Sequence, residues 1–448
     1  MASMEQHPTV KQFREQQAAL HVLQPKPTVD AAWLRSLALE AGADDVGFVE
    51  LGRPEIADQR SEILATMPGT RTLISFVRRM NRQAIRTPMR SMSNVEFHTT
   101  GEEVNETGRR IAHALEQRGI RALNVTMGFP MEADRWPSKM WVVSHKPVAV
   151  AAGLGKMGIH RNVIHPRFGN FILLGTVLVA VEVSEHSREL DYNPCLECKL
   201  CVSACPTGAI KADGGFDFSA CYTHNYREFM GGFSDWVENI ADSGSRSEYR
   251  QRVSDSETVS MWQSLSFGAN YKAAYCLSVC PAGEEVIAPF LTDRKEYLAD
   301  VVKPLQNKAE TVYVLTGSDA ESYVARRFPH KKTKRVHNGV RPNSIENFLR
   351  GLRLVFQREA SAGLDATYHF TFTGEEEKVV TVAIREKALS VMDGHVGTPS
   401  LRVVADSHTW LRFLAKEISM VWALVRGKIR IRGGSPKLLL AFARCFPS

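Results

Sequence analysis

The spacing of apolar residues switches between helical and extended periods along the first 180 residues. Apolar positions recur at helical spacing where we expect helices, and continuous apolar runs mark the segments that favour strands. The expected helices lie at 30–42 and 105–119, and the expected strands lie at 45–51, 72–77, 121–125 and 171–180. Strands that alternate with helices predict an α/β layer.

The pattern changes after Arg341-Pro342-Asn343-Ser344, which marks a domain boundary. Beyond it we expect a separate α+β module of about a hundred residues. Its expected elements are a helix at 345–360, strands at 368–372, 379–384 and 400–405, one helix from 407 to about 426, and a strand and turn at 427–434. The helix after residue 407 is apolar on most faces, so its side chains either form core or line an internal cavity.

Composition is that of an ordinary globular protein and excludes several classes. The chain has 448 residues, 44% hydrophobic and 23% charged, with a formal charge of +7. These values exclude a disordered, collagen-like or coiled-coil chain, and the mild basic excess does not require a DNA partner. No apolar stretch is long enough for a membrane span, and no leader pattern is apparent at Met1, so we expect a cytoplasmic protein. The basic run 326–335 is either a solvated face or a contact for anionic lipid or a redox partner.

Seven of the eight cysteines lie between Cys195 and Cys280. The first four read Cys195-x2-Cys198-x2-Cys201-x3-Cys205-Pro206, which is the bacterial ferredoxin run. In that run three closely spaced thiolates hold one cubane, and the fourth reaches a neighbouring cluster. A zinc ribbon normally uses two CxxC knuckles and needs no such fourth cysteine, so the pattern favours iron–sulfur ligation.

The return half is Cys276-x3-Cys280-Pro281, in which Cys280 is expected to complete a 4Fe–4S cluster with the first three cysteines. Cys205 and Cys276 are then left for a second cluster, with Cys221 as a plausible third ligand, because Ala273 stands where a full repeat needs a cysteine. The second cluster would be 3Fe–4S, or 4Fe–4S completed by His224, a carboxylate or water. Alternatively only one cluster forms, and Cys221 is a buried small hydrophobic residue.

The stretch Gly153-Leu154-Gly155-Lys156-Met157-Gly158 matches GxGxxG. In a dinucleotide fold this motif follows a strand, whereas residues 148–152 here favour a helix. We therefore reject dinucleotide binding by this motif.

Residues of about 30–295 resemble the epoxyqueuosine reductase and reductive dehalogenase superfamily. The resemblance is carried by residues 151–158, the turn Pro166-Arg167-Phe168-Gly169-Asn170, and the ferredoxin run that follows the 173–180 strand. It implies a nitroreductase-like core that binds base-off cobalamin beside a cluster, with electrons supplied by a ferredoxin or flavodoxin. Electrons would pass first through the Cys205 cluster and then through the Cys195 cluster to cobalt. The expected cobalamin contacts are Gly153, Gly155, Lys156, Gly158 and Asn170; the alternative is that the glycines only form a tight helix–strand connection.

Epoxyqueuosine reductases carry an acidic general acid in an Asp-x-x-Pro element before the glycine stretch, and Ser144 stands at that position here. Reduction at carbon needs a proton donor within hydrogen-bond reach. The neighbouring His145 and Lys146 are therefore the candidate catalytic residues. His98, His160 and Arg161 are more remote candidates.

Residues of about 345–448 resemble a sterol-carrier-protein type 2 domain, a family that encloses an apolar tunnel for acyl chains or sterols. The match lies in Phe370-Thr371-Phe372-x-Gly374, residues 379–384, the turn 394–399, Trp410 and the segment 427–433. The resemblance implies a lipid-binding module fused to the reductase half.

Together these observations predict an α/β and α+β multidomain protein. Its expected parts are a corrinoid-binding core at 28–190, a two-cluster ferredoxin-type segment at 191–295, a linker with a small α/β element at 296–343, and the sterol-carrier-like domain at 344–448. We expect a cobalamin-dependent iron–sulfur reductase acting on a hydrophobic small molecule by dehalogenation, epoxide reduction or a related C–X reduction. The alternatives are an iron–sulfur electron-transfer protein without corrinoid that carries a lipid-binding module, and a lipid-binding protein with structural or sensory clusters.

Overall fold

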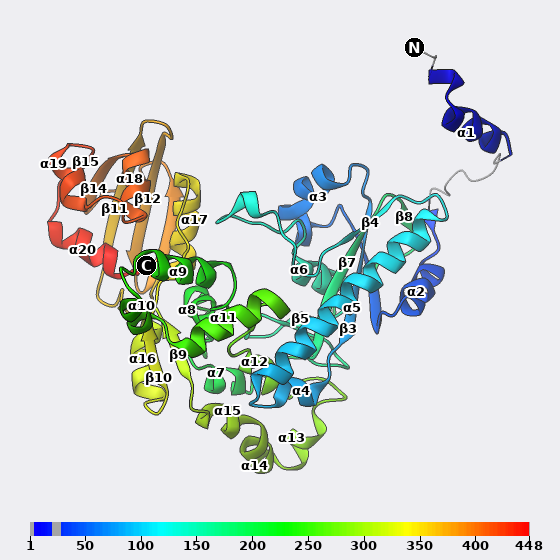
Figure 1. The fold of residues 1–448 in the computed structure, drawn as a ribbon, viewed down its shortest axis with the longest axis horizontal. Helices are drawn as coiled ribbons and strands as arrows, with labels where there is room; N and C mark the ends of the chain where they lie inside the picture. Colours follow the sequence, from blue (N-terminus) through cyan, green and yellow to red (C-terminus); the bar gives the residue numbers. More distant parts are fainter. Residues whose placement is uncertain (1–3, 20–27, 448) are drawn as a thin grey trace.

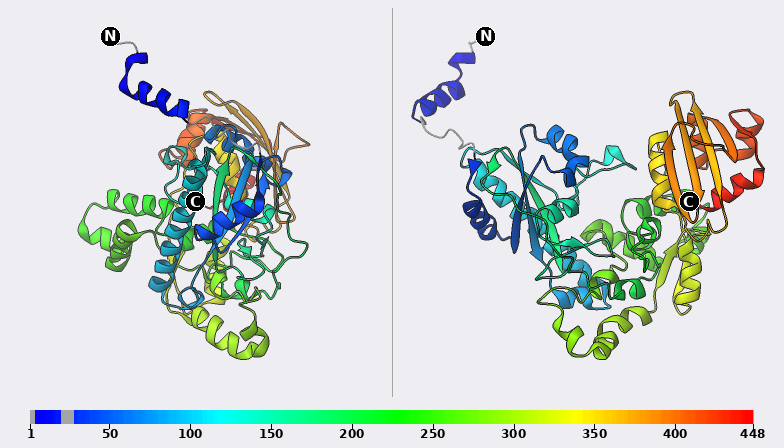
Figure 2. Two further views of the ribbon diagram at one scale, coloured as in Figure 1. Left: turned by 90° about the vertical axis from the view of Figure 1, so that its right-hand side faces the viewer. Right: turned by 180° about the vertical axis from the view of Figure 1, so that it is seen from behind.

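The computed structural model describes residues 4–19 and 28–447 and arranges them in three bodies (Figure 1). A sheet-containing core lies at one side, a mostly helical segment lies in the middle, and a five-stranded module lies at the other side. Helix α1 (Pro8–Ala19) stands away from the core in all views (Figure 2). Residues 1–3 lie outside the described residues, and the expected lack of a leader partly rests on them. Ser448, at the end of the expected last domain, also lies outside them.

The core is built on a four-stranded sheet in the order β2-β3-β7-β4, with antiparallel pairing throughout. Its strands are β2 (Asp45–Glu50), β3 (Thr72–Arg79), β7 (Ile172–Val179) and β4 (Ala122–Val125). The four expected strands are therefore present, and the mixed α/β character is confirmed. The nitroreductase-like description of this core remains a prediction.

Both faces of the core sheet are covered, which explains why its strands are continuously apolar. Ile74 and Phe76 pack with helices on one face, whereas Leu73 and Val77 pack with helices on the other. The first face is covered by α2 (Ala31–Glu40) and α5 (Arg90–Glu116), and the second by α3 (Arg60–Thr66) and α6 (His145–Ala151). Smaller elements of the core are α4 (Arg82–Arg86), the parallel pair β1 (Thr28–Val29) and β8 (Glu182–Val183), and the antiparallel pair β5 (Lys156–Met157) and β6 (Val163–Ile164).

The middle segment is mostly helical and lies between the other two bodies (Figures 1 and 2). Its helices are α7 (Leu200–Ala204), α8 (Phe218–Asn225), α9 (Met230–Ala241), α10 (Arg246–Arg252), α11 (Asp255–Phe267), α12 (Tyr275–Ser278), α13 (Ala288–Thr292), α14 (Arg294–Tyr297), the π-helical turn η4 (Leu298–Val302) and α15 (Lys303–Asn307). A small unit follows, consisting of β9 (Thr311–Val314), α16 (Asp319–Arg327) and β10 (Lys332–Arg335), with the two strands paired in parallel.

The unit expected to be part of a linker packs closely against the cysteine-bearing segment. Val312 and Val324 share one buried cluster with Leu200 and Ala209. Within the basic run 326–335, Lys331 is buried against Glu310 at 2.7 Å, whereas Arg326, Arg327, Lys332 and Arg335 are exposed. Residues 296–343 therefore share a hydrophobic core with the ferredoxin-type segment and do not form a loose linker after it.

The C-terminal module is a five-stranded sheet in the order β13-β12-β11-β14-β15, covered on one face by helices. Its elements are α17 (Ile345–Val355), β11 (Ala366–Thr373), β12 (Lys378–Arg385), β13 (Ala388–Asp393), β14 (Leu401–Asp406), α18 (Ser407–Leu414), α19 (Met420–Val425), β15 (Ile429–Arg432) and α20 (Pro436–Arg444). The aromatic side chains Phe348, Phe370, Phe372, Trp410 and Phe442 fill the space beneath the sheet. This packing favours the core interpretation of Trp410, and the sterol-carrier description remains a prediction.

Several expected elements differ from the observed ones; the helix expected at 345–360, for example, ends at Val355. The helix expected at 105–119 begins at Arg90. Its first turns were not expected, because they bear polar and small residues that carry no clear apolar period. The helix expected from 407 to 426 was wrong as a single element: it breaks at Lys416, whose backbone is left-handed with φ +62°. Strand β13 was not expected; it is formed by a hairpin that turns through left-handed Glu386 and Lys387.

Candidate metal centre

The first group of thiols lies around one small cavity between the middle segment and the core. The residues lining this cavity include Cys195, Cys198, Cys201, Cys280, Ile159 and His160. Glu197 and Lys199 have left-handed backbones, with φ of +49° and +59°, so the short loop curls and turns its cysteines inward. Burial, and after it the nearby thiols Cys276 and Cys280, raises the pKa of Cys201. The four cysteines predicted to hold the first cluster are therefore close together.

The second group consists of Cys205, Cys221 and Cys276. Burial is the largest cause that raises the pKa of Cys221, followed by Cys205 and then Cys276. The pKa of Cys276 is raised to about 12 by burial and then by Cys205. Each of these thiols thus lies close enough to another to take part in these pKa shifts. The structure brings together the three residues expected to hold a second cluster.

Two short helices, each preceded by a left-handed residue, carry cysteines of the two groups. Helix α7 follows the left-handed Lys199, and α12 follows the left-handed Ala274, with φ of +55°. Each helix carries one cysteine, Cys201 or Cys276, and the next cysteine comes four residues later. Each half therefore contributes to both groups, as in a two-cluster ferredoxin.

Ala273 occupies the place in the second half that Cys198 occupies in the first. It is buried, its N–H donates to Asn225 Oδ1 at 3.0 Å, and its carbonyl accepts a hydrogen bond from Arg90. The second group therefore has three cysteines, and the identity of a fourth ligand remains a prediction.

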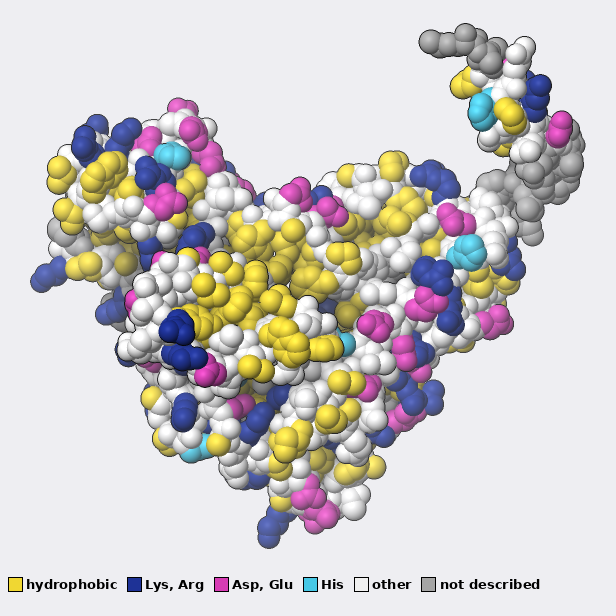
Figure 3. All heavy atoms as spheres, in the orientation of Figure 1, with side chains coloured by type: hydrophobic (Ala, Val, Ile, Leu, Met, Phe, Trp, Pro, Cys, Tyr) yellow, Lys and Arg dark blue, Asp and Glu magenta, His cyan; other side chains and the backbone are white. Residues whose placement is uncertain are grey.

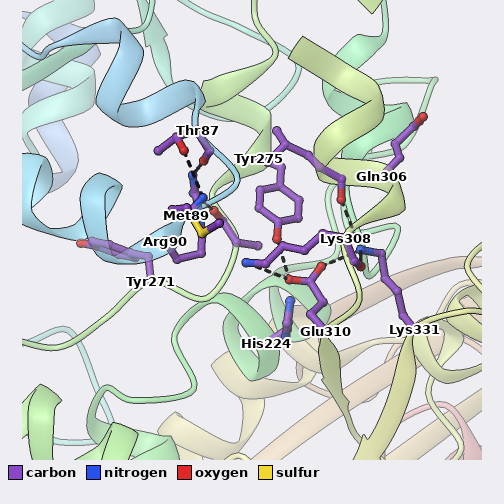
Figure 4. A network of polar contacts seen from close by, with 12 residues as sticks. Thr87, Met89, Arg90, His224, Tyr271, Tyr275, Gln306, Lys308, Glu310 and Lys331 are labelled. Atoms are coloured by element: carbon purple, nitrogen blue, oxygen red, sulfur yellow. Dashed lines mark hydrogen bonds and ion pairs between the residues drawn. The ribbon is translucent and has the colours of Figure 1, made fainter. Parts of the chain in front are cut away.

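His224 lies on α8, three residues after Cys221, and its Nε2 has no hydrogen-bond partner among the described residues. Its Nδ1 accepts a hydrogen bond from the Tyr313 N–H at 3.3 Å, and its ring points toward Glu310 (Figure 4). Glu310 also accepts hydrogen bonds from Tyr275 Oη at 2.5 Å and from Lys331 Nζ at 2.7 Å. Burial lowers the pKa of His224 to about 4, so its ring is neutral at physiological pH.

The donor set fits iron–sulfur clusters better than a single ion. All eight cysteines are free thiols. Within the described ranges 4–19 and 28–447, no three His, Cys, Asp or Glu side chains converge tightly enough to hold one metal ion. Thiolates around a cubane are spread further apart than the ligands of a mononuclear site. The first four thiols here line a cavity and do not converge on the position of a single ion.

The candidate proton donors His145 and Lys146 begin helix α6 but face different partners. The Nε2–H of His145 donates to the Thr126 carbonyl at 2.9 Å, and its Nδ1 accepts from Thr176 Oγ1 at 2.8 Å. This tautomer is assigned from the carbonyl, which can only accept. Burial lowers the pKa of His145, which favours the neutral imidazole. Both nitrogens of that neutral ring are then occupied by the two hydrogen bonds.

Lys146 is exposed at the surface, although protein atoms crowd around its amine. Its Nζ donates to the Arg161 carbonyl at 2.7 Å and to Asn162 Oδ1 at 2.9 Å. Burial lowers its pKa, and the nearby Cys276 and Cys221 oppose that shift. Lys146 is therefore the candidate donor that lies beside the second thiol group.

The more remote candidates are dispersed. His160 lines the first thiol cavity, its Nε2 lies 3.3 Å from Asn170 Nδ2, and burial lowers its pKa to about 4. Arg161 donates to the Gly214 carbonyl at 3.1 Å. His98 lies on α5 against Gly268, away from the cysteines.

The glycine stretch packs against the protein's own backbone. A Cβ atom on Gly153 would lie 2.3 Å from the Arg188 carbonyl oxygen, and one on Gly155 would lie 2.5 Å from that of Ile164. A Cβ on Gly158 would meet the His160 ring at 2.8 Å. These contacts account for the glycines without a ligand, and their contact with cobalamin remains a prediction.

The two other predicted cobalamin contacts also have surroundings within the protein. Lys156 is paired with Glu189. Asn170 is buried, and its Oδ1 has no hydrogen-bond partner among the described residues. Neither observation assigns a corrin contact.

An aromatic wall, which sequence reasoning missed, joins the core to the middle segment. Ring contacts run from Phe129 to Phe229 at 5.9 Å, from Phe229 to Tyr271 at 4.9 Å, and from Tyr271 to Phe97 at 5.0 Å. Tyr226 joins this wall and has Cys221 and Cys276 among its neighbours. Aromatic residues at 222, 226 and 229 share a helical period that could have indicated such a wall. Figure 3 shows apolar side chains gathered along the hollow between the lobes.

The cysteine arrangement defines an iron–sulfur protein of the ferredoxin type. Residues 189–211 match the family described as "4Fe-4S binding domain". Among curated proteins, the chain is similar to epoxyqueuosine reductase of Vibrio cholerae, with 33% identity over 20% of this chain and 24% of the relative. It is also similar to epoxyqueuosine reductase of Pseudomonas aeruginosa, with 25% identity over 46% of this chain and 63% of the relative. The chain thus covers less than two thirds of either relative.

Similarity to solved structures is partial. A structure of epoxyqueuosine reductase from Streptococcus thermophilus matches with a TM-score of 0.34 and 15% identity, over 60% of this chain and 74% of that one. A catabolic reductive dehalogenase matches with a TM-score of 0.31 and 16% identity, over 40% of this chain and 25% of that one. No helix in the described part of this chain has both the length and the apolar character needed to cross a membrane.

Proposed function

We propose that this protein is an iron–sulfur oxidoreductase that takes a corrinoid and reduces a hydrophobic small molecule. One observation carries the proposal: two groups of thiols, interleaved through α7 and α12, lie close to each other, and Lys146 lies beside the second group. Clusters held by adjacent thiol groups form a short path for electrons. The partial similarity to epoxyqueuosine reductases supports a reductive reaction at the end of that path.

Cys195, Cys198, Cys201 and Cys280 would hold one 4Fe–4S cluster. Cys205, Cys221 and Cys276 would hold a second cluster, of the 3Fe–4S or 4Fe–4S type. A ferredoxin or flavodoxin would supply the electrons. Because α7 and α12 pack against each other and carry cysteines of different groups, Cys201 and Cys276, the two clusters would lie next to each other.

The corrinoid rests on the family resemblance, with Gly153, Gly155, Lys156, Gly158 and Asn170 as its proposed contacts. When bound, its reduced cobalt supplies the nucleophilic centre that attacks an activated carbon. The chain's part is to orient the substrate, to exclude water and to deliver a proton.

Lys146 is the proposed proton donor. Its Nζ donates to two acceptors, the Arg161 carbonyl and Asn162 Oδ1, and its third proton has no acceptor among the described residues. Burial lowers its pKa toward the working range of a general acid. His145 is the weaker candidate, since its single N–H is already donated to Thr126.

The apolar nature of the substrate is supported by the aromatic wall beside the second thiol group. Phe129 is 48% exposed, and Phe218, which stacks on Tyr222 next to Tyr226, is 42% exposed. Exposed aromatic rings next to buried ones offer a surface for a flat or apolar molecule. Reduction of a modified tRNA nucleoside is less well supported, because Ser144 replaces the acidic residue expected for that reaction.

A second candidate function is electron transfer without a corrinoid. The close packing of Gly153 and Gly155 on the chain's own carbonyl groups favours it, since no cofactor is then needed to explain these glycines. In that case the clusters would serve a separate oxidoreductase.

The deciding experiment is anaerobic purification, followed by iron and sulfide analysis, EPR, and visible absorption after addition of hydroxocobalamin. The proposal expects iron for two clusters and a corrinoid spectrum that stays with the protein through gel filtration. Lys146→Met should retain both and lose turnover with halogenated or epoxide substrates, whereas the matched variant Lys139→Met should stay active. Iron without corrinoid retention would favour the second candidate. A protein that acts only on tRNA would refute the small-molecule substrate.

A further inference from the structure

The outer end of the C-terminal module exposes apolar side chains that would be expected in a core. Val421 and Val425 on α19 are 70% and 81% exposed, and Leu440 on α20 is 72% exposed. Trp422 and Leu424 are also partly exposed. Figure 1 shows α19 at the far edge of the molecule and α20 running from that edge back toward the middle segment. No described part of the chain covers this apolar surface.

The same end is strongly basic. Residues 419–448 contain six Lys or Arg residues and no Asp or Glu. Those six residues are Arg426, Lys428, Arg430, Arg432, Lys437 and Arg444. Lys428 lies 4.0 Å from Asp406, whereas the other five make no ion pair with any described carboxylate. Figure 3 shows basic and apolar side chains intermixed on this lobe.

At the edge of the sheet, exposed arginines lie close together in an arrangement that an external anion would stabilise. Arg432 on β15 is directly opposite Arg402 on β14, and both are exposed. Like charges directly opposite each other on a sheet face destabilise it. Arg430 follows on the same face, two residues from Arg432, so three guanidinium groups share one exposed surface without a described acidic partner.

We propose that this end of the module, formed by α19, the edge strand β15 and α20, docks on the surface of an anionic phospholipid bilayer. Exposed Val, Leu and Trp side chains surrounded by Lys and Arg are typical of segments that lie at a membrane interface. The apolar residues would enter the headgroup boundary, and the basic residues would contact anionic headgroups. A nucleic acid would satisfy the arginines but would gain nothing from exposed Val421, Val425 and Leu440, so the apolar content favours the bilayer.

The proposal makes no use of the clusters and is independent of the proposed function. It also concerns the outside of the module, because the space beneath the sheet is filled by aromatic residues. The contact would be peripheral, in keeping with the absence of a membrane-crossing helix among the described residues.

Vesicle co-sedimentation of the full chain tests the proposal, with vesicles of phosphatidylcholine alone and of phosphatidylcholine with phosphatidylserine. We expect binding to the anionic vesicles that weakens as salt is raised, and little binding to the neutral ones. Each basic residue near a charged bilayer contributes about fivefold in affinity, so Arg430→Gln with Arg432→Gln should weaken binding by roughly 25-fold. Val425→Ser should weaken it by roughly tenfold, from the loss of one buried aliphatic side chain.

Two matched variants serve as controls. Arg326→Gln with Arg327→Gln removes two exposed charges from α16, and Leu265→Ser removes an exposed apolar side chain from α11; both should leave vesicle binding unchanged. Thermal unfolding verifies that every variant is folded. Equal binding to neutral and anionic vesicles, an absence of binding, or equal loss in the controls would overturn the proposal. Binding of tRNA that Val425→Ser leaves intact, without vesicle binding, would assign the surface to nucleic acid instead.

Discussion

Replacement of Gly153 by alanine tests whether the glycine stretch is required by the fold. Gly153 has φ +73°, and its added Cβ would lie 2.3 Å from the Arg188 carbonyl oxygen. Gly119 is a matched control with the same φ of +73° and nothing within 4 Å of an added Cβ. The left-handed conformation costs an alanine about 1–2 kcal/mol at either position. The clash adds a further cost at Gly153 alone, since a backbone oxygen cannot rotate away as a side chain can.

Overpacking of this kind costs roughly 1–3 kcal/mol, so Gly153→Ala should be less stable than Gly119→Ala by that amount. For a domain of this size each kcal/mol lowers the melting temperature by about 2–4 °C. Differential scanning calorimetry should therefore show the core transition of Gly153→Ala several degrees below that of Gly119→Ala. Because the chain has several domains, the comparison uses the core transition alone.

Equal melting temperatures for the two variants would refute the packing explanation. If Gly153→Ala kept its stability but lost a corrinoid that the unsubstituted protein retains, the glycine would serve the ligand instead of the fold. Loss of both would be expected if the turn supports the fold and the cofactor together.

Three further predictions follow from buried groups. Cys198→Ser should lower bound iron by the amount of one cluster, whereas Cys445→Ser, a buried thiol in the C-terminal module, should leave iron analysis unchanged. Asp235→Asn should destabilise the middle segment by about 3 kcal/mol in urea unfolding, because it leaves the buried guanidinium of Arg227 unpaired. His224 takes up its proton near pKa 4 when folded and near its ordinary pKa of about 6.5 when unfolded. Stability should therefore fall as pH drops from about 6.5 to about 4, and His224→Phe should reduce that slope; an unchanged slope would exclude His224 as its source.

The sequence predicted the parts of the fold in which local pattern and tertiary packing agree. The core strands are buried on both faces, so their apolar runs were visible without any partner. The cysteine spacing likewise predicted two thiol groups, because it matches the ferredoxin run; the short loop gathers Cys195, Cys198 and Cys201 locally, whereas Cys276 and Cys280 are brought to them by the fold. The break at Lys416 was hidden, since apolar residues continue on both sides of it and nothing in their spacing signals a left-handed residue.

The surroundings of the predicted site residues could not be read from spacing. His145 and Lys146 are neighbours in sequence, but one is fixed between Thr126 and Thr176 while the other reaches Arg161 and the thiols. The glycine stretch resembled a cofactor loop, yet the atoms that exclude a side chain at Gly153 belong to residue 188, far along the chain. Long-range packing decided both cases.

The position of Lys146 bears on the direction of electron flow in the proposed function. The order expected from the resemblance placed the Cys205 cluster at the entry and the Cys195 cluster next to the reacting centre. Yet Cys276 and Cys221, from the second group, are the thiols that influence Lys146. In the proposed reaction electrons reach the substrate by way of the corrinoid, so the last cluster is the one beside the corrinoid contacts, whichever thiol group lies beside the proton donor. The second group adjoins the aromatic wall through Tyr226. The proposed corrinoid contacts Gly158 and Asn170 adjoin His160, which lines the first thiol cavity, so these contacts favour the expected order, with entry at the Cys205 group and exit at the Cys195 group.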